Sequence, residues 1–526
     1  MPTLETLPTE VLLSITELLT YHDWKNLSVL NKHLRHAVAP SLYRTLKVNC
    51  PIKEDHVAID VVRKYGAYVH ELRFDVNFYP NPKPDEDKWK PTPQEEEYYR
   101  SAIAKGYPGR RCAPPSVAED IRKVIHGFWK SPPASVWAWS KADVAMVHDL
   151  LRFENLPHCK TLTVHTIPDD NFTQRDIAGD EAAWDDTHKR GIGIDVFVDA
   201  ENWNEVDRKE KTFFWRAALR DMYRDIATIS PTKALKILNF FPKKVSFWRS
   251  KKWSAFLGCL ERLTLHTHGS RDDMGYQVTK MSGFKSFFSK DLPDHLLRYV
   301  TKLRYLEIVA LKYGFLDDFT LDFTLDDSYV AMSNVEELHL ENMALTGVVS
   351  FLSMYHGKRK LSKVRIVNCA AQTLDSSEYP DHPSWANLFS ILQSQIMPGS
   401  EIEITLPERL LLPDERYESY LGECQITESE DEYEDVQHLR KMLQEDKDFY
   451  GWPYVWVCSG SAYSVPQAEV NMERLEMGDD NLHFGLLVDK LQKGGGKCIV
   501  NYHICGAGPG SCFNCVYLEK RTNDRG

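Results

Sequence analysis

Three short stretches of this chain repeat one pattern: LERLTL at 260–265, LRYLEI at 303–308 and VEELHL at 335–340. In each stretch, two apolar residues flank one polar residue, and a third apolar residue stands three places before the first of that pair. This alternation has a period of two and is typical of a strand with one buried face and one solvated face. The segments 291–299 and 345–355 between the strands are candidate helices. We therefore expect a strand-then-helix unit that recurs along the chain.

The same apolar-x-x-apolar-x-apolar unit extends in both directions from these stretches. A unit of this kind repeated in series builds a curved solenoid with a parallel sheet, whereas the alternative is an ordinary α/β domain with several parallel strands. The spacing between units is uneven, so a solenoid would carry inserted loops. The units are Val69/Leu72/Phe74, Cys159/Leu162/Val164, Leu235/Leu238/Phe240, Leu260/Leu263/Leu265, Leu303/Leu306/Ile308, Val335/Leu338/Leu340, Leu361/Val364/Ile366 and, more weakly, Ile402/Ile404.

A second feature of the unit is the residue that follows it. In leucine-rich repeats a small or amide residue stands three places after the last apolar position and stacks along the solenoid. Asn77 and Cys369 match that position, whereas His268, Leu311 and Met343 do not. The chain thus resembles an irregular leucine-rich-repeat-like solenoid, which implies an α/β fold over residues 47–410.

Residues 4–46 contain three short helical patterns. Pro8 suits the first position of a helix, and Glu10 is favourable near the positive end of the helix dipole. Asp23 is expected to cap a second helix, and Asn31 a third. Because so short a unit buries little surface, apolar residues beyond those its core needs suggest a face that binds a partner.

This N-terminal segment resembles an F-box, a trihelical module that binds the Skp adaptor of a cullin–RING ubiquitin ligase. The resemblance implies a substrate-recognition subunit without catalytic activity, whose repeat domain recruits a protein substrate. An F-box followed by leucine-rich repeats is a familiar arrangement among such subunits, and the irregular repeats are reminiscent of fungal members. Trp24 departs from the family, which usually has a smaller aliphatic residue there. The resemblance places these residues in or near the adaptor-facing surface: Leu7, Pro8, Glu10, Leu12, Ile15, Leu18, Leu27 and Leu30.

If the solenoid forms, alternate residues of its strands face outward from the apolar core. Together they make a mixed-charge, partly aromatic stripe on the concave face, the usual contact surface of repeat arrays. The alternative is an ordinary solvated sheet face. The candidate substrate-binding residues are Arg262, Thr264, His266, Tyr305, Glu307, Glu337, His339, Glu341, Lys363 and Arg365.

Several segments have a composition unlike that of the repeats. Residues 77–115 are rich in proline and residues 168–190 are polar and acidic, so we expect both to be surface loop insertions. Residues 411–450 include a run of carboxylates and are expected to be an acidic linker, either a solvated tether or a contact for a basic partner. Residues 451–526 are expected to form a C-terminal cap or small extension, with strands at 452–457 and 498–502 and a helix over 480–492.

Composition narrows the class of partner. The chain has 526 residues and a net charge of −12, which argues against nucleic acid as the main partner and mildly favours basic substrates. We find no secretory signal and no long uncharged apolar run, so we expect no membrane partner and a cytoplasmic or nuclear location. The 11 cysteines are scattered and odd in number, which favours reduced thiols.

No motif indicates catalysis. The sequence lacks the spacings of a serine nucleophile elbow, a zinc protease or a dinucleotide site, so we expect no enzyme, no cofactor and no metal. His503, Cys505, Cys512 and Cys515 offer zinc ligands, but the His503-x-Cys505 half is tight for a structural site, and free thiols are the expectation. Two alternatives to a ligase subunit stay open. One is an adaptor-binding protein acting outside a ligase, and the other is a ligand-binding or enzymatic C-terminal domain fused to an F-box.

Overall fold

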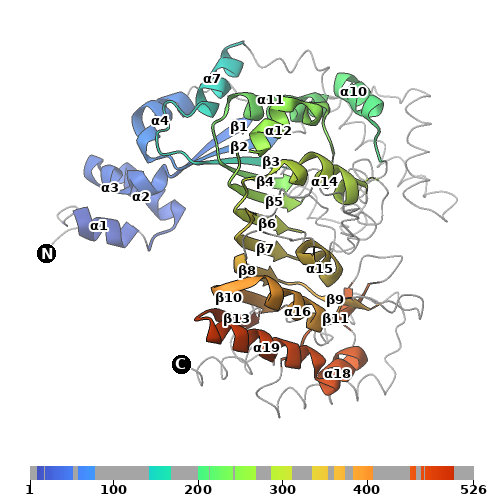
Figure 1. Ribbon diagram of the computed structural model, residues 1–526. Helices are drawn as coiled ribbons and strands as arrows, with labels where there is room; N and C mark the ends of the chain where they lie inside the picture. Colours follow the sequence, from blue (N-terminus) through green and yellow to red (C-terminus); the bar gives the residue numbers. More distant parts are fainter. Residues whose placement is uncertain are drawn as a thin grey trace, which may run out of the picture.

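A computed structural model of the chain is shown in Figure 1. It describes residues 7, 9–16, 18–50, 57–77, 141–167, 200–212, 214–240, 243–267, 283, 286–310, 334–353, 361–373, 383–406, 450–457, 464–466 and 468–502. The two expected insertions beyond Asn77 and Ile167, the acidic linker up to residue 449, Pro8 and all four candidate zinc ligands lie outside these described residues.

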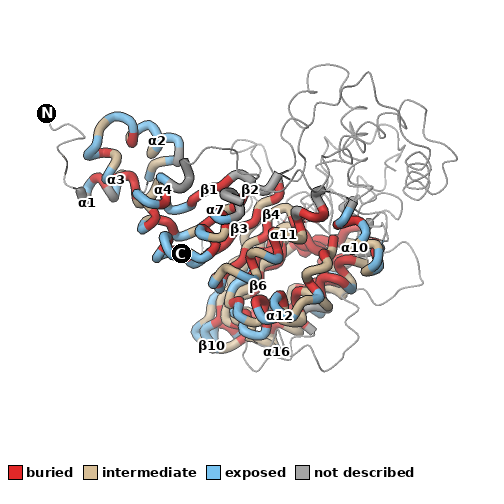
Figure 2. The backbone as a smooth tube through the Cα atoms, turned by 90° about the horizontal axis from the view of Figure 1, so that it is seen from above, coloured by how far each residue is buried: buried red, intermediate tan, exposed pale blue. Residues whose placement is uncertain are grey.

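The described N-terminal residues form three helices, α1 (Thr9–Thr16), α2 (Tyr21–Leu30) and α3 (Lys32–Leu42). Leu12, Leu34 and Ala37 make their small core, and Leu7 and Leu27 pack against it. Figures 1 and 2 place these helices beside the first strand, at one end of the large sheet.

The caps of these helices confirm one expectation and correct another. Asn31 caps α3, because its Oδ1 accepts a hydrogen bond of 2.8 Å from the Leu34 amide. Asp23 is not the cap of α2. Thr20 is, and the Asp23 carboxylate reaches back to accept from the Thr20 amide at 3.0 Å, a capping box that puts the acid at the third helical position.

Ten strands form one large sheet in which every neighbouring pair is parallel. Their order across the sheet is their order along the chain. The expected α/β class with a large parallel sheet is therefore confirmed. The strands are β1 (Thr45–Cys50), β2 (Glu71–Asn77), β3 (Thr161–Ile167), β4 (Ala234–Phe240), β5 (Arg262–Thr267), β6 (Tyr305–Val309), β7 (Glu337–Glu341), β8 (Leu361–Val367), β10 (Ile396–Leu406) and β13 (Lys497–Tyr502).

The strand register aligns the apolar positions into two rows on one face of the sheet. These rows are almost wholly buried and join a single hydrophobic core. The first row is Leu46, Leu72, Leu162, Leu235, Leu263, Leu306, Leu338, Val364, Ile402 and Cys498, and the second is Val48, Phe74, Val164, Ile237, Leu265, Ile308, Leu340, Ile366, Ile404 and Val500.

Strand β4 departs from the expected unit. The register aligns Leu235 and Ile237 with the inner rows and pairs Leu238 with His165 on the opposite face, so the unit Leu235/Leu238/Phe240 is wrong by three residues. The preceding position of the true unit is the buried Thr232, whose Oγ1 donates to the Lys160 carbonyl at 3.1 Å. Because a threonine fills that position, the apolar pattern did not show that the unit starts at residue 232.

Helices cover the apolar face of the sheet (Figure 1), and their buried side chains belong to the same core as the inner rows. The expected helix at 291–299 is a π-helical turn (Phe287–Asp291), a single turn α14 (Leu292–His295) and a 3-10 turn (Leu297–Tyr299). The other helices are α4 (Val57–Tyr65), α7 (Lys141–Leu151), α10 (Trp203–Thr212), α11 (Phe214–Ile229), α12 (Lys251–Leu257), α15 (Leu345–Ser353), α16 (Trp385–Gln395), α18 (Ala468–Met477) and α19 (Asp479–Lys493).

The described part of the C-terminal segment continues the large sheet instead of forming a separate extension. Strand β13 pairs with β10 as the tenth strand, and α19 buries Phe484, Leu487 and Leu491 in the common core. Strand β11 (Tyr454–Val457) joins a second, small sheet with β9 (Ala371–Thr373) and β12 (Ser464–Pro466). The strands and helix expected in this segment are present.

Asparagines at the strand ends form a recurring feature that the sequence analysis missed. Asn239, Asn342 and Asn368 have positive φ angles of 53°, 58° and 50°, and each stands two places after the second inner residue of its strand. Asn342 Nδ2 donates to the Ala310 carbonyl at 2.8 Å, and Asn239 Nδ2 donates to the Thr166 carbonyl at 2.8 Å. These amides thus link each unit to the one before it.

Candidate functional site

The first candidate surface lies on α1, α2 and the turn between them, which contains Leu18. Leu18 and Leu30 are 87% and 66% exposed, and Val11 and Val29, which were not among the predicted contacts, are also exposed. Leu12 is only 2% exposed and belongs to the small core, which corrects its place in the partner-facing set. Leu7, Ile15 and Leu27 are partly buried, and the side chains of Pro8 and Glu10 lie outside the described residues.

The second candidate surface is the outer face of the large sheet, opposite the apolar rows. The register brings all ten predicted residues onto this face of β5 to β8. Thr264, Glu307, His339 and Arg365 stand side by side in one row, and Arg262, Tyr305, Glu337 and Lys363 in the next. The prediction that these residues share one face is therefore confirmed, whereas their binding of a substrate stays a prediction.

Glu307 is the centre of a polar cluster on this face. Its Oε2 accepts hydrogen bonds from Thr264 Oγ1 and from the Tyr305 hydroxyl, both at 2.9 Å. Its Oε1 lies 3.0 Å from His339 Nδ1 and 3.7 Å from His266 Nε2. The other ring nitrogen of His339 lies 3.5 Å from Glu341 Oε2, within ion-pair range. We call these residues the Glu307 cluster.

The geometry of the cluster sets the charge of its members. Both nitrogens of the His339 ring face carboxylates, which only accept protons, so only the doubly protonated ring donates to both. Burial would lower the pKa of His339, but its contacts with Glu307 and Glu341 raise it above the ordinary value. Burial likewise would raise the pKa of Glu307, but the nearby rings of His266 and His339 and the hydroxyls of Thr264 and Tyr305 hold it well below its usual range. The cluster is thus a fixed pattern of opposite charges.

The charged residues around the cluster are paired across neighbouring strands. Lys363 lies 3.4 Å from Glu401 and Arg365 lies 3.3 Å from Glu403, so β10 extends the outer face beyond the predicted residues. The Arg262 guanidinium stacks 3.8 Å from the centre of the Tyr305 ring. The face is therefore mixed in charge across its width.

A second polar cluster, on β1 to β3, was missed. The buried Asp75 carboxylate lies 2.5 Å from Lys47 Nζ, 2.7 Å from Arg73 Nε and 3.1 Å from His165 Nδ1. These residues alternate with the inner apolar residues of their strands, so the period-two rule that placed the residues of β5 to β8 would also have placed them. The outer face therefore carries two carboxylates that are each surrounded by donors.

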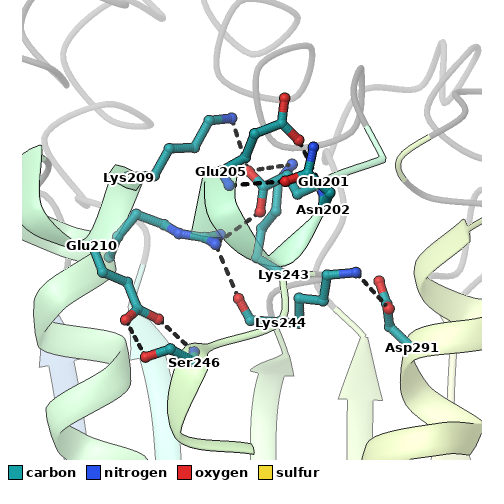
Figure 3. A network of polar contacts seen from close by, with 10 residues as sticks. Glu201, Asn202, Glu205, Lys209, Glu210, Lys243, Lys244, Ser246 and Asp291 are labelled. Atoms are coloured by element: carbon teal, nitrogen blue, oxygen red, sulfur yellow. Dashed lines mark hydrogen bonds and ion pairs between the residues drawn. The ribbon is translucent and has the colours of Figure 1, made fainter. Parts of the chain in front are cut away.

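A buried polar network lies beyond the end of β4 and ties α10 and α11 to the segment that follows that strand (Figure 3). Glu201 bonds Lys209 and Arg216, each at 2.8 Å, and lies 3.4 Å from Lys243. Burial would raise the pKa of Glu201, but these three cations hold it far below its usual range. Lys244 extends the network to Asp291, whose Oδ1 lies 2.8 Å from Lys244 Nζ. Because all these groups are buried against one another, the network serves to anchor the helices.

The remaining observations on the described residues concern metal sites, pockets and membrane-spanning helices. Within them, no three histidine, cysteine or carboxylate side chains are placed to hold a metal ion. A shallow hollow lies between α18, α19 and the segment before β11, lined in part by Trp452, Arg474 and Asp480, and it has room for about one water molecule. Among the helices that the structure describes, none is both long and apolar enough to cross a bilayer.

No protein-family model matches the chain. No curated protein matches it significantly either.

Proposed function

We propose that this chain is the substrate-recognition subunit of a Skp–cullin–F-box ubiquitin ligase. In this proposal α1 to α3 bind the Skp adaptor, and the outer face of the sheet binds a protein substrate. The observation that carries the proposal is the exposed apolar surface of α1 and α2. Val11, Leu18, Val29 and Leu30 face solvent even though the three helices have a small core of their own. Four exposed apolar side chains on so small a unit make it a candidate docking surface.

The order of the strands supports the second half of the proposal. Parallel strands that follow one another in chain order, with helices on one face, are the arrangement that a repeated strand-then-helix unit produces. We therefore interpret the sheet as an irregular leucine-rich-repeat-like solenoid. Its outer face is long, mixed in charge and partly aromatic, which suits recognition of a protein partner.

The proposed role requires no catalytic group in this chain. A receptor that holds a substrate beside the charged ubiquitin of its partner subunits accelerates transfer by proximity. The Glu307 cluster, Arg262 and Arg365 would then select the substrate, and the chemistry would belong to the other subunits.

The test is co-expression of the full chain with the Skp adaptor, followed by size-exclusion chromatography with mass detection. We expect a one-to-one complex that is lost in the double variant Leu18→Asp/Leu30→Asp. These residues are exposed, so the change should leave the fold intact, unlike changes at Leu7, which packs against the small core. Leu486→Asp, on the exposed face of α19, is the matched control and should keep the complex.

Two results would count against the proposal. If the wild-type chain elutes alone and folded, the adaptor is not its partner. If the complex forms but survives the double variant, α1 and α2 are not the docking surface. A complex that contains the adaptor but never a cullin in cell extract would indicate a role outside a ligase.

A further inference from the structure

Exposed large apolar side chains of the described residues occur in two places. One is the α1–α2 surface, and the other is α18 and α19 near the opposite end of the sheet (Figure 1). The second group is not used by the proposed function. It consists of Met477, Leu482 and Leu486, which are 54%, 60% and 47% exposed.

Helix α19 has two apolar stripes. Phe484, Leu487 and Leu491 form the buried one, which packs in the common core. Leu482 and Leu486 are four residues apart, so they lie one above the other on the same face of the helix, away from the buried stripe. A helix that buries one apolar stripe and exposes another is unusual for a surface helix, whose outer face is ordinarily polar.

Gly485 lies between the two exposed leucines. It is exposed, and a Cβ at this position would meet no atom within 4 Å. Glycine inside a helix lowers helix stability relative to alanine, so the fold of a single chain gives no reason for it. A bare backbone on an exposed apolar face does allow a second helix to approach closely. This observation is independent of the exposed leucines and points to the same face.

The charges of α19 identify the occupant. Asp479 and Asp480 stand in the first turn, and Lys490 and Lys493 in the last. Asp479 and Lys493 are both exposed, whereas Lys490 donates to the Gln393 carbonyl of the same chain. If a second α19 lies antiparallel across the leucines, the acidic end of each copy faces the basic end of the other, and the helix dipoles oppose. The exposed ends of the helix, Asp479 and Lys493, are thus complementary in charge, with the exposed Asp489 one turn before Lys493.

We propose that α19 forms an antiparallel contact with α19 of a second copy of this chain, in which Leu486 packs against its own copy at a two-fold axis, Leu482 flanks it, and Asp479 pairs with Lys493. The contact is isologous, since the same surface serves both copies. One helix of 15 residues, about 22 Å long, offers a small interface, so the association is weak and depends on concentration. The inference does not depend on the proposed function, because the α1–α2 surface takes no part in it.

The test is the mass of the full chain by sedimentation velocity over two decades of micromolar concentration. We expect the mass to rise from one chain of 60.7 kDa toward two as concentration increases. The double variant Leu482→Glu/Leu486→Glu should remain a single chain throughout. Leu18→Glu, which alters the other exposed apolar surface, is the matched control and should associate as the wild type does.

A charge exchange tests the antiparallel geometry separately from folding. Asp479→Lys and Lys493→Asp should each weaken association several-fold, and the two together should restore it. A wild-type chain that stays single at every concentration would overturn the proposal. So would a dimer that is unaffected by the leucine variants, or a charge exchange that fails to restore the contact.

Discussion

At the scale of residues, the Glu307 cluster shows how a parallel sheet places charge. Glu307, His339 and Glu341 come from neighbouring strands, and their register brings both nitrogens of the imidazole within reach of carboxylates. A neutral ring would leave one carboxylate facing an acceptor, which is costly for a half-buried group. The two carboxylates therefore favour the protonated ring in the folded state and raise its pKa above the ordinary value.

This arrangement predicts how stability depends on pH. The folded state raises the pKa of His339, so its contribution is fully present below the unfolded value of about 6.5 and is lost as pH rises through the folded pKa. We expect the difference in unfolding free energy between the wild type and His339→Gln to shrink from pH 6 to pH 9. Urea unfolding at several pH values measures it.

The control for this prediction is Glu341→Gln, which removes one of the two carboxylates that raise the pKa of His339. In that variant the contribution of His339 to the free energy of unfolding should begin to fall at a lower pH than in the wild type. A difference that stays constant or grows with pH would mean that His339 is neutral in the folded chain.

At the scale of elements, β4 shows what a sequence pattern cannot decide. Two frames fit residues 232–240, and the one with three apolar residues is not the one that folds, because Thr232 occupies the first buried position. The choice is made by pairing with β3 and β5, whose inner rows accept Leu235 and Ile237.

The frame of β4 can be tested by two substitutions that are similar in size. Ile237 is buried and Leu238 is half-exposed on the outer face. Ile237→Ala should lower the free energy of unfolding by about 2–5 kcal/mol, because it opens a cavity in the core. Leu238→Ala should cost well under half of that. Chemical denaturation of both variants checks this, and equal losses, or a larger loss at Leu238, would show that the register is different.

The buried network makes a second prediction at this scale. Lys209, Arg216 and Lys243 share the carboxylate of Glu201, so Glu201→Gln removes the negative charge that faces these three buried cations. We expect it to destabilise the chain by about 3–5 kcal/mol.

The matched control for the network is Glu205→Gln, four residues along the chain in the first turn of α10. The Glu205 side chain caps the helix by accepting from the Asn202 amide at 2.8 Å, which a glutamine oxygen also does. Glu205→Gln should lower the free energy of unfolding by less than about 1 kcal/mol. Similar losses from both variants would indicate that the charge of Glu201 is not what stabilises the helices.

At the scale of the whole molecule, the sequence predicts the central strands of the large sheet better than the strands near its two edges. Inner positions of β5 to β8 follow from a local period of two, and successive strands of a repeated unit lie next to each other. The place of β13 in the same sheet was not foreseen, because a long segment separates it from β10. The period of two also places Lys47, Arg73, Asp75 and His165 on the outer face, but that they meet around one carboxylate follows only from the register of β1, β2 and β3.

The same limit applies to the N-terminal helices. Helical spacing places Leu12, Ile15 and Leu18 on one helix, but spacing alone does not separate core from contact residues. Packing of α1 against α3 buries Leu12 and leaves Leu18 exposed. Val11 and Val29 were missed as exposed residues for the same reason.

The most direct test of the central claim is hydrogen–deuterium exchange of the full chain with and without the Skp adaptor. We predict that the adaptor slows amide exchange in α1 and α2, over residues 9–30, and leaves the strands of the large sheet and α19 unchanged. Protection confined to the sheet or to α19, or no protection anywhere, would contradict the account.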